Sequence, residues 1–159
     1  MHDHAFYMQR AIELAARAEQ LNEVPVGALV VSDQGEIIGE GWNQPISSSD
    51  PTAHAEIIAV RKAAEFLGNY RLNNATLYVT LEPCTMCCGA LIHSRIKQVV
   101  YGATEPKAGA VDSHLQLLNL DHTNHRVGVI AGVCGEECSG QLSRFFQRRR
   151  QEKKDNKHL

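Results

Sequence analysis

The chain has 159 residues, the length of one ordinary domain, and we expect a single domain over residues 1–159. With 43% hydrophobic and 21% charged residues, its composition excludes collagen-like, disordered and low-complexity proteins. The longest apolar run, Val24 to Val31, has about eight residues, whereas a membrane span needs about 20. Asp3 and Arg10 interrupt any signal-peptide core. We therefore expect a soluble, cytoplasmic protein without a membrane segment.

The net charge of −2 is distributed unevenly. From Arg144 onward, seven lysines and arginines stand against two acids, so this segment carries +5 and the rest of the chain −7. A solvated helix end with i,i+4 ion pairs is one interpretation of such a tail. Clustered guanidinium groups also attract phosphates, so contact with a nucleic acid is the other.

Helices and strands are predicted to alternate along the chain. Apolar residues at helical spacing predict the first helix, and β-branched runs predict the first two strands, with a turn at Gln34-Gly35. Pro83 is expected in the first turn of a helix, where proline is tolerated. Residues 43–52 and 106–112 are predicted loops. The predicted elements are a helix at 5–21, strands at 26–31 and 37–42, a helix at 54–67, a strand at 76–81, a helix at 83–94, strands at 98–103 and 127–131, and a helix over about 136–152 that belongs to a basic C-terminal helix or tail, 136–159.

This order predicts the fold class. Strands separated by helices pair in parallel, and one opening hairpin makes the sheet mixed. We therefore expect an α/β fold, a three-layer α/β/α domain with a mixed five-stranded sheet.

Two short motifs carry chemically reactive side chains at predicted helix starts. One contains His54 and Glu56, and the other contains Cys84 and Cys87. Helix N-termini present free N–H groups and a partial positive charge, which favour thiolates. Cys84 and Cys87 are three residues apart, so both sulfur atoms can reach one point, and His54 meets them if the two helices pack side by side.

One histidine and two cysteines are a ligand set suited to zinc. Three protein ligands leave a fourth tetrahedral position for water, which distinguishes a catalytic zinc from a structural one. Glu56 lies two residues after His54, a spacing at which helical side chains point apart. It is therefore poorly placed as a ligand and well placed to carry protons to and from the water.

The cysteines permit two other interpretations. Cys134 and Cys138 could join Cys84 and Cys87 in a closed four-thiolate structural site, or Cys84 and Cys87 could form a redox pair. Both alternatives leave the histidine and the glutamate of the first motif unexplained. The catalytic zinc site accounts for all of these residues and is favoured.

The two motifs, His-Ala-Glu and Pro-Cys-x-x-Cys, match the signature known for zinc-dependent deaminases as a class. With further segments, the chain resembles the bacterial tRNA-specific adenosine deaminases over nearly its whole length. These segments are PVGALVV (25–31), GWN (41–43), DPTAHAE (50–56), NYRL (69–72), TLEPCTMCCGALIHSRI (80–96), PKAGAVDS (106–113), NHRV (124–127), and Phe145-Phe146 with Arg149-Arg150.

The resemblance implies a cytidine-deaminase-like fold, a homodimer, and conversion of adenosine to inosine at the wobble position of a tRNA anticodon stem-loop. Carried over by position, Glu56 is the proton shuttle and Asn43 hydrogen-bonds the flipped nucleotide. The implied ligands of one Zn²⁺ per subunit are His54, Cys84 and Cys87.

With a tRNA substrate, phosphate contact becomes the favoured interpretation of Arg149 and Arg150. Glu105 stands where the family usually has aspartate, and this longer acid is expected to alter a contact near the sugar of the target nucleotide. Cys88 replaces a small residue and is expected to be buried. Core packing is expected for Met86 and for at least one of Phe145 and Phe146.

Two other functions remain open at this point. A deaminase of free nucleobases or nucleosides, such as guanine or cytosine, uses the same zinc chemistry but gains nothing from a basic tail. A zinc-stabilised RNA-binding module needs neither Glu56 nor an open metal position.

Overall fold

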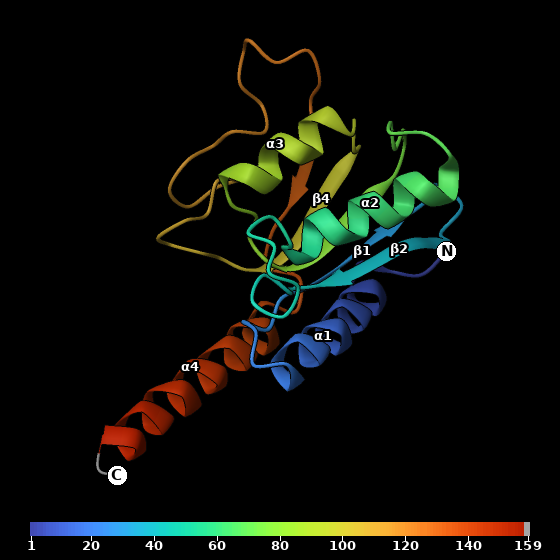
Figure 1. Cartoon of the computed structure of the whole chain (residues 1–159). Coiled ribbons are helices and arrows are strands. Elements are labelled where there is room, and N and C mark those ends of the chain that lie inside the picture. Colours follow the sequence, from blue (N-terminus) through green and yellow to red (C-terminus); the bar gives the residue numbers. More distant parts are fainter. Residues whose placement is uncertain (158–159) are drawn as a thin grey trace.

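The computed structural model describes residues 1–157. Figure 1 shows helices on both sides of a twisted sheet, with the last helix extending away from the body. The elements are α1 (His4–Gln20), β1 (Gly27–Val31), β2 (Ile37–Trp42), α2 (Ala55–Leu67), β3 (Thr76–Leu81), α3 (Thr85–His93), β4 (Gln98–Ala103), β5 (Gly128–Ile130) and α4 (Gly135–Lys157). No helix among these residues is long and apolar enough to cross a membrane.

The five strands form one mixed sheet in the order β2-β1-β3-β4-β5. β1 pairs antiparallel with both β2 and β3, whereas β3, β4 and β5 run parallel. The predicted order of elements and the mixed five-stranded sheet are confirmed. The carboxyl ends of β2, β3 and β4 all lie at one end of the sheet, the usual place for ligand binding in α/β folds.

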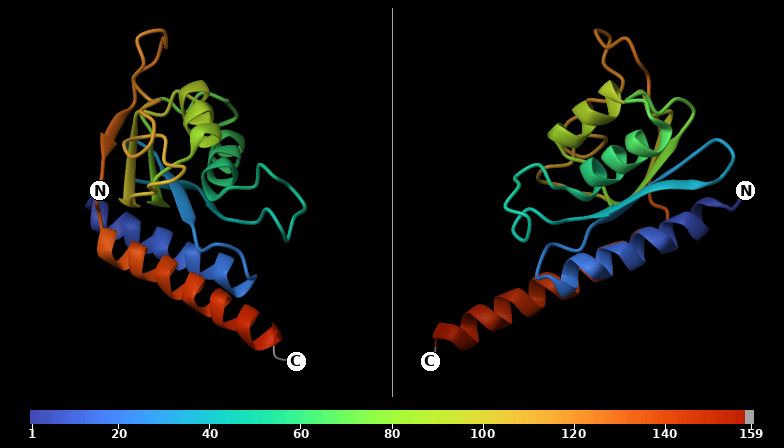
Figure 2. Two further views of the ribbon diagram at one scale, coloured as in Figure 1. Left: turned by 90° about the vertical axis from the view of Figure 1, so that its left-hand side faces the viewer. Right: turned by 45° about the vertical axis from the view of Figure 1, so that its right-hand side comes forward.

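The helices form two layers. α2 and α3 lie on one face of the sheet and α1 and α4 on the other, where they run side by side (Figure 2). Each face has its own apolar core, one that includes Val79 and Leu91 and one that includes Met8 and Leu29. The three-layer α/β/α prediction is therefore confirmed.

Glycines in the hairpin allow helices to lie close to the sheet. A Cβ atom at Gly39 would lie 2.3 Å from the carbonyl oxygen of Ala59 in α2. A Cβ atom at Gly27 would lie 2.0 Å from the carbonyl oxygen of Ala11 in α1. Only glycine permits these approaches, and the first one fixes how closely the middle of α2 sits against the sheet.

Two predicted element boundaries are wrong in an informative way. Pro83 does not open α3, because Cys84 is its N-cap residue and the helix begins at Thr85. α4 continues to Lys157, five residues beyond the predicted end. Ion pairs and hydrogen bonds one turn apart, Arg148–Glu152 and Gln151–Asp155, support this extension. The last two residues of the predicted tail, 158 and 159, lie outside the described residues.

Candidate active site

Two helices begin at the residues predicted to bind metal. His54 is the N-cap residue of α2 and Cys84 is the N-cap residue of α3, and both have extended backbone conformations. Neither side chain makes a capping hydrogen bond. Both positions normally favour serine, threonine, aspartate or asparagine, which cap the helix. Here each side chain is free to point into the space between the two helices.

His54, Cys84 and Cys87 converge on one point. The Nδ1 atom of His54 lies 3.6 Å from the Sγ atom of Cys84 and 3.6 Å from that of Cys87. A tetrahedral zinc ion, with Zn–S of about 2.3 Å and Zn–N of about 2.0–2.1 Å, separates nitrogen and sulfur ligands by about 3.5 Å. The ligand atoms are therefore spaced to hold zinc. Among residues 1–157, these three form the one group of histidine, cysteine and acidic side chains that could bind a metal ion.

The electrostatics of the cluster favour a thiolate. Hydrogen bonds from Cys87 and His54 lower the pKa of Cys84 to about 4. The bond with Cys84 also raises the pKa of His54. The hydrogen bond with Cys84, together with burial, raises the pKa of Cys87. Without metal, the two cysteines thus hold one negative charge between them, and binding of a cation favours removal of the second proton.

Glu56 lies in the first turn of α2 and is only 4% exposed. Burial raises the pKa of its carboxyl group above the usual value. A carboxyl group whose pKa lies closer to neutrality can both accept and return a proton at working pH. Glu56 lines the same cavity as His54 and Cys84.

This cavity has a volume of about 180 Å³, below the 300–1,000 Å³ typical of drug-sized ligands. It therefore suits one ring system rather than a larger molecule. Asn43 lies in its wall, where its Oδ1 atom accepts a hydrogen bond of 2.9 Å from the Ala55 N–H. The NH₂ group is then the part of Asn43 that can donate to a ligand. Apolar and acidic side chains complete the wall: Val24, Val26, Leu81, Glu82, Glu105 and Ala108.

A second hollow of about 410 Å³ shares Val24 and Asn43 with the cavity. Its other walls include Ile46, Phe146 and two cationic side chains, Arg149 and Lys153, from α4. Arg150 is exposed on α4 and lines neither hollow. The structure thus brings Arg149 beside Asn43 and leaves Arg150 facing solvent.

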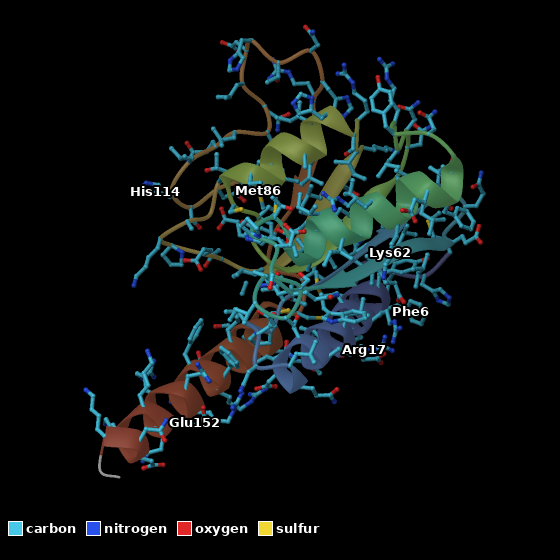
Figure 3. All side chains as sticks on the ribbon, in the orientation of Figure 1. Phe6, Arg17, Lys62, Met86, His114 and Glu152 are labelled. Atoms are coloured by element: carbon cyan, nitrogen blue, oxygen red, sulfur yellow. The ribbon has the colours of Figure 1, made fainter. Side chains whose placement is uncertain are left out.

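The two adjacent phenylalanines have different surroundings. Phe145 is 4% exposed and Phe146 is 43% exposed, so the expectation that at least one is buried is confirmed. Met86 is 36% exposed on α3, so its predicted place in the core is wrong. The helix turns this residue outward because Cys87, Cys88 and Leu91 occupy its inner face. Figure 3 marks Met86 on α3 and Glu152 on the projecting part of α4.

Two buried carboxylates that the motifs did not predict hold the loops around the cavity. Glu23 accepts hydrogen bonds from the backbone N–H groups of Ile46 and Ser47. Burial alone would raise the pKa of Glu82, but hydrogen bonds from Ser113, Asp112 and Glu105 outweigh it and hold the pKa below its usual value. Glu82 lies within the segment 80–96 that resembles the family, but no role could be assigned to it from the sequence, because its partners lie 23 to 31 residues away.

The four-thiolate alternative is wrong. Among residues 1–157, the one potential metal-binding group contains Cys84 and Cys87 but neither Cys134 nor Cys138. Cys138 belongs to the core on the α1 and α4 face of the sheet, whereas Cys87 lies on α3, on the opposite face. Cys134 accepts a hydrogen bond from Gln9 of α1. Cys88 is fully buried, as expected, and burial raises the pKa of its thiol to about 12.

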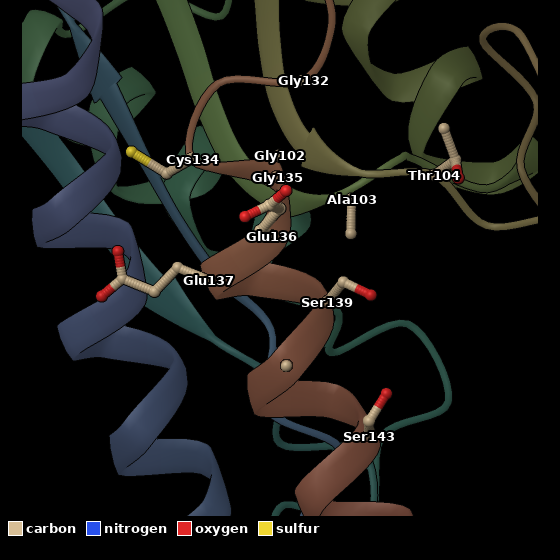
Figure 4. A pocket seen from close by; sticks show the side chains of 11 residues that line it. Gly102, Ala103, Thr104, Gly132, Cys134, Gly135, Glu136, Glu137, Ser139 and Ser143 are labelled. Atoms are coloured by element: carbon tan, nitrogen blue, oxygen red, sulfur yellow. The ribbon is translucent and has the colours of Figure 1, made fainter.

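A larger hollow, about 1,040 Å³, lies beside the start of α4. Figure 4 shows Ser139 and Ser143 along one side of this helix, with Glu137 turned toward α1. Glycines, serines and the acids Glu136 and Glu137 form much of its lining. It lies apart from the convergent ligands, and its acidic groups disfavour phosphate.

Comparison with known proteins identifies the family. The chain matches the cytidine and deoxycytidylate deaminase zinc-binding region over residues 1–103. It is 58% identical to the tRNA-specific adenosine deaminase of Haemophilus influenzae, over 96% of this chain and 88% of that protein. The chain belongs to the tRNA-specific adenosine deaminases. The tRNA-specific adenosine deaminase of Bacillus subtilis is 46% identical, over 93% of this chain and 91% of that protein.

Solved structures agree with this membership. A tRNA:A34 deaminase, studied for A-to-I editing at the wobble position of transfer RNA, is 41% identical and superposes with a TM-score of 0.82, covering 86% of this chain and 98% of that one. A guanine deaminase from Bacillus subtilis is 35% identical with a TM-score of 0.61, covering 77% of this chain and 88% of that one. The similarity to the tRNA-specific adenosine deaminases is thus greater in sequence and in structure.

Proposed function

We propose that this protein is a zinc-dependent tRNA adenosine deaminase, which converts adenosine to inosine at the wobble position of an anticodon and releases ammonia. The observation that carries the proposal is the junction of two hollows at Asn43. The smaller one is lined by the ligands His54 and Cys84 and by Glu56, and the larger one is lined by Arg149 and Lys153. One base fits beside the reactive groups while the attached phosphates meet positive charge.

His54, Cys84 and Cys87 would hold the zinc ion, since their spacing fits its tetrahedral geometry. When bound, zinc acts as a Lewis acid that makes water nucleophilic near neutral pH. The partial positive charges at the starts of α2 and α3 stabilise the negative ligand at Cys84.

Glu56 moves the protons. The oxygen of water forms a bond to C6 of adenine while Glu56 transfers a proton from that water to N1. Glu56 then takes the remaining proton from the oxygen now bound to C6 and gives it to the exocyclic amine. The C6–N bond breaks as the C6 oxygen becomes a carbonyl, and ammonia leaves. Its burial excludes competing water from the carboxylate and raises its pKa, so the protonated form is accessible between these two steps.

The remaining residues position the nucleotide. Asn43 donates from its NH₂ group to the flipped nucleotide, because its Oδ1 atom is engaged with Ala55. Drawing a base out of its stack costs least in a single-stranded loop, such as that of an anticodon. Arg149 contacts phosphates of the strand that leads into the cavity, and Arg150 contacts phosphates farther along the stem-loop.

Two copies of this chain form a homodimer through α3. Its residues are apolar around most of its circumference, and Met86 remains 36% exposed. Gly89 lies in the middle of α3, where a Cβ atom would meet no atom of the described part of the chain within 4 Å. Glycine inside a helix costs about 0.5–1 kcal/mol relative to alanine, and no contact among residues 1–157 requires it. Close packing of a second copy against α3 accounts for both features.

The five cysteines are free thiols. Free thiols persist in a reducing compartment, and we place the protein in the cytoplasm on this ground and on the nature of its substrate.

The proposed activity predicts ammonia release from an anticodon stem-loop with adenosine at the wobble position. Free adenosine, cytosine and guanine should release little ammonia, because they have no phosphates to contact Arg149 and Lys153 in the second hollow. Glu56→Ala should keep its zinc and lose about 10²–10⁴-fold in rate, the contribution of general acid–base catalysis. Measuring ammonia and bound zinc for each substrate and variant checks both statements.

Preferred turnover of guanine would support the runner-up, a nucleobase deaminase. Absence of ammonia from every substrate, with RNA still bound, would support an RNA-binding module instead. Near-normal turnover by Glu56→Ala would remove Glu56 from the mechanism.

A further inference from the structure

Glu82 follows the last residue of β3 and lies two residues before the ligand Cys84. Its side chain is 2% exposed, yet its carboxylate has no cationic partner in an ion pair among residues 1–157. Instead the carboxylate accepts hydrogen bonds from a single segment, residues 104–113, which we call the wall loop.

Five donors of the wall loop converge on this carboxylate. Oε1 accepts from the Glu105 N–H at 3.0 Å and from the Ser113 hydroxyl. Oε2 accepts from the N–H groups of Val111, Asp112 and Ser113 at 3.2, 2.8 and 2.8 Å. The donors come from both ends of the loop, so one buried carboxylate holds the two ends of the wall loop together.

The loop passes close over the carboxylate at Gly109. A Cβ atom there would lie 2.5 Å from the Cδ atom of Glu82 and 2.6 Å from its Oε1 atom. Glycine is therefore required at this position for the loop to stay in contact with Glu82. The Ala110 N–H also donates to the carbonyl oxygen of Pro83 at 2.9 Å, which ties the loop to the turn that carries Cys84.

The wall loop also forms one side of the reaction cavity. Glu105 and Ala108 line this cavity together with Glu56 and His54. Ala108 is exposed, so its position depends on the backbone of the loop rather than on packing within the core. The carboxylate therefore fixes the loop that faces the substrate, and the bond from Ala110 to Pro83 ties this loop to the turn that carries a metal ligand.

We infer that Glu82 is a positioning residue for deamination, which holds the wall loop in the conformation that accepts the target nucleotide. This inference rests on the proposed function. When the loop is already ordered, binding pays no free energy to order it. When the loop is loosened, a smaller fraction of the protein is competent to bind, and the apparent dissociation constant rises by the same factor.

The test compares Glu82→Gln with the wild type and with Glu65→Gln, the same change at an exposed position of α2. An amide retains one acceptor oxygen and presents an NH₂ group to N–H donors, so this set of hydrogen bonds cannot form. Hydrogen exchange followed by mass spectrometry reports on residues 104–113 without use of any substrate. Zinc content, kcat and KM with the adenosine stem-loop are measured on the same preparations.

We expect faster exchange confined to the wall loop, zinc content equal to that of the wild type, and a KM raised about 10-fold. The ratio kcat/KM should fall about 10–100-fold, as for other small misplacements of a substrate. A merely structural role would reduce the amount of active protein, which lowers kcat and leaves KM unchanged. If Glu82→Gln does not fold, Ser113→Ala removes one donor from the loop side and should shift exchange and KM in the same direction.

Unchanged exchange in the wall loop, exchange that rises evenly through the core, or a loosened loop with unchanged KM would each overturn the inference. A wild type that does not deaminate the stem-loop would overturn the proposed function and the catalytic part of this inference. The exchange data would then still decide whether Glu82 holds the loop.

Discussion

At the scale of single residues, the start of α2 is stabilised by a side chain from outside the helix, that of Asn43. His54 occupies the N-cap position of α2 but directs its imidazole toward the cysteines. Asn43, eleven residues earlier, accepts a hydrogen bond from the Ala55 N–H, one of the N–H groups at the start of α2 that have no acceptor within the helix. The start of α2 is thus stabilised from the loop, and the residue that provides this stability also lines the cavity.

Substitution of Asn43 can separate these two roles. Asn43→Ala removes the acceptor and should lower the free energy of unfolding by about 1 kcal/mol, the typical value of a helix cap. Asn43→Asp keeps an acceptor at the start of α2 and should retain stability. Both variants lack the NH₂ donor and should lose about tenfold in kcat/KM, the value of one hydrogen bond. Urea unfolding and steady-state kinetics with the stem-loop measure the two effects.

A stable Asn43→Asp variant with wild-type kinetics would remove the nucleotide contact from Asn43. An Asn43→Ala variant that unfolds at the same urea concentration as the wild type would remove its capping role. Zinc content serves as the control in both cases, because neither substitution changes a ligand.

The metal ligands could be predicted from the sequence because each lies in a short motif with a fixed spacing. Glu23 and Glu82 could not be predicted in the same way. Their partners are backbone N–H groups of distant loops, which leave no pattern of side-chain types. The prediction for Met86 was wrong because methionine on a short apolar helix indicates burial, whereas the packing of Cys87, Cys88 and Leu91 turns this residue outward.

At the scale of elements, α4 has two parts. Its first half packs on β4 and β3 and buries Cys138, Gln141 and Phe145. Its second half projects beyond the body, with bases and acids along its surface (Figure 1). In the projecting half, Arg148 and Arg149 form ion pairs with Glu152. The exposed Arg150, Lys153 and Lys154 leave an excess of positive charge for a partner of opposite sign.

Counterion release makes this role measurable. Arg149→Ala and Arg150→Ala should each reduce the slope of log affinity against log salt by about 1 for the stem-loop, as expected for one lost phosphate contact. Removal of residues 149–159 should flatten the slope further. Arg149→Ala should also weaken binding more at fixed salt, because Arg149 lines the groove beside Asn43. Fluorescence anisotropy at several salt concentrations provides these values.

Lys97→Ala is the matched control, since Lys97 is exposed next to the start of β4, at the opposite end of the strands from the site. Its salt slope should equal that of the wild type. An unchanged slope after truncation would instead make the tail a solvated helix end, the first of the two interpretations of its charge.

Element types were predictable because hydrophobic spacing is a local property, whereas element ends depend on tertiary contacts. Pro83 could occupy a first helical turn, but the backbone of Cys84 is extended and α3 begins after it. The end of α4 depends on charged pairs one turn apart, and the same charges that predicted a solvated tail extend the helix to Lys157.

At the scale of the whole molecule, the two faces of the sheet carry helices with different functional residues. The face with α2 and α3 carries the metal ligands and Glu56, and the face with α1 and α4 carries the basic extension. The metal ligands and the basic extension come together at the end of the sheet where Asn43 follows β2 and Glu82 follows β3. Alternation of helices and strands predicted the layers, but only the folded chain shows that Arg149 of α4 reaches the same end as the zinc site.

The outer surface of the α2 and α3 face predicts self-association. Gly89→Glu adds a side chain at a position where a Cβ atom meets no atom within 4 Å in the part of the chain that the structure describes, so the monomer should fold and keep zinc. In an isologous dimer, each copy would place one unpaired charge in the interface, at a cost of several kcal/mol. We therefore expect association to weaken by more than about 100-fold. Native mass spectrometry measures this directly, with two chains and two zinc ions per particle for the wild type and one of each for the variant.

Ser143→Glu adds the same charge on α4, on the opposite face of the sheet, and should remain dimeric. A Gly89→Glu variant that stays dimeric would place the interface elsewhere, and a monomeric wild type would leave the exposed apolar side of α3 without a partner copy. Because the second hollow with Arg149 and Lys153 and the α3 surface lie on different elements, loss of the dimer should leave the salt dependence of RNA binding by each chain unchanged. A salt slope that falls together with the dimer would show instead that both copies contact one RNA.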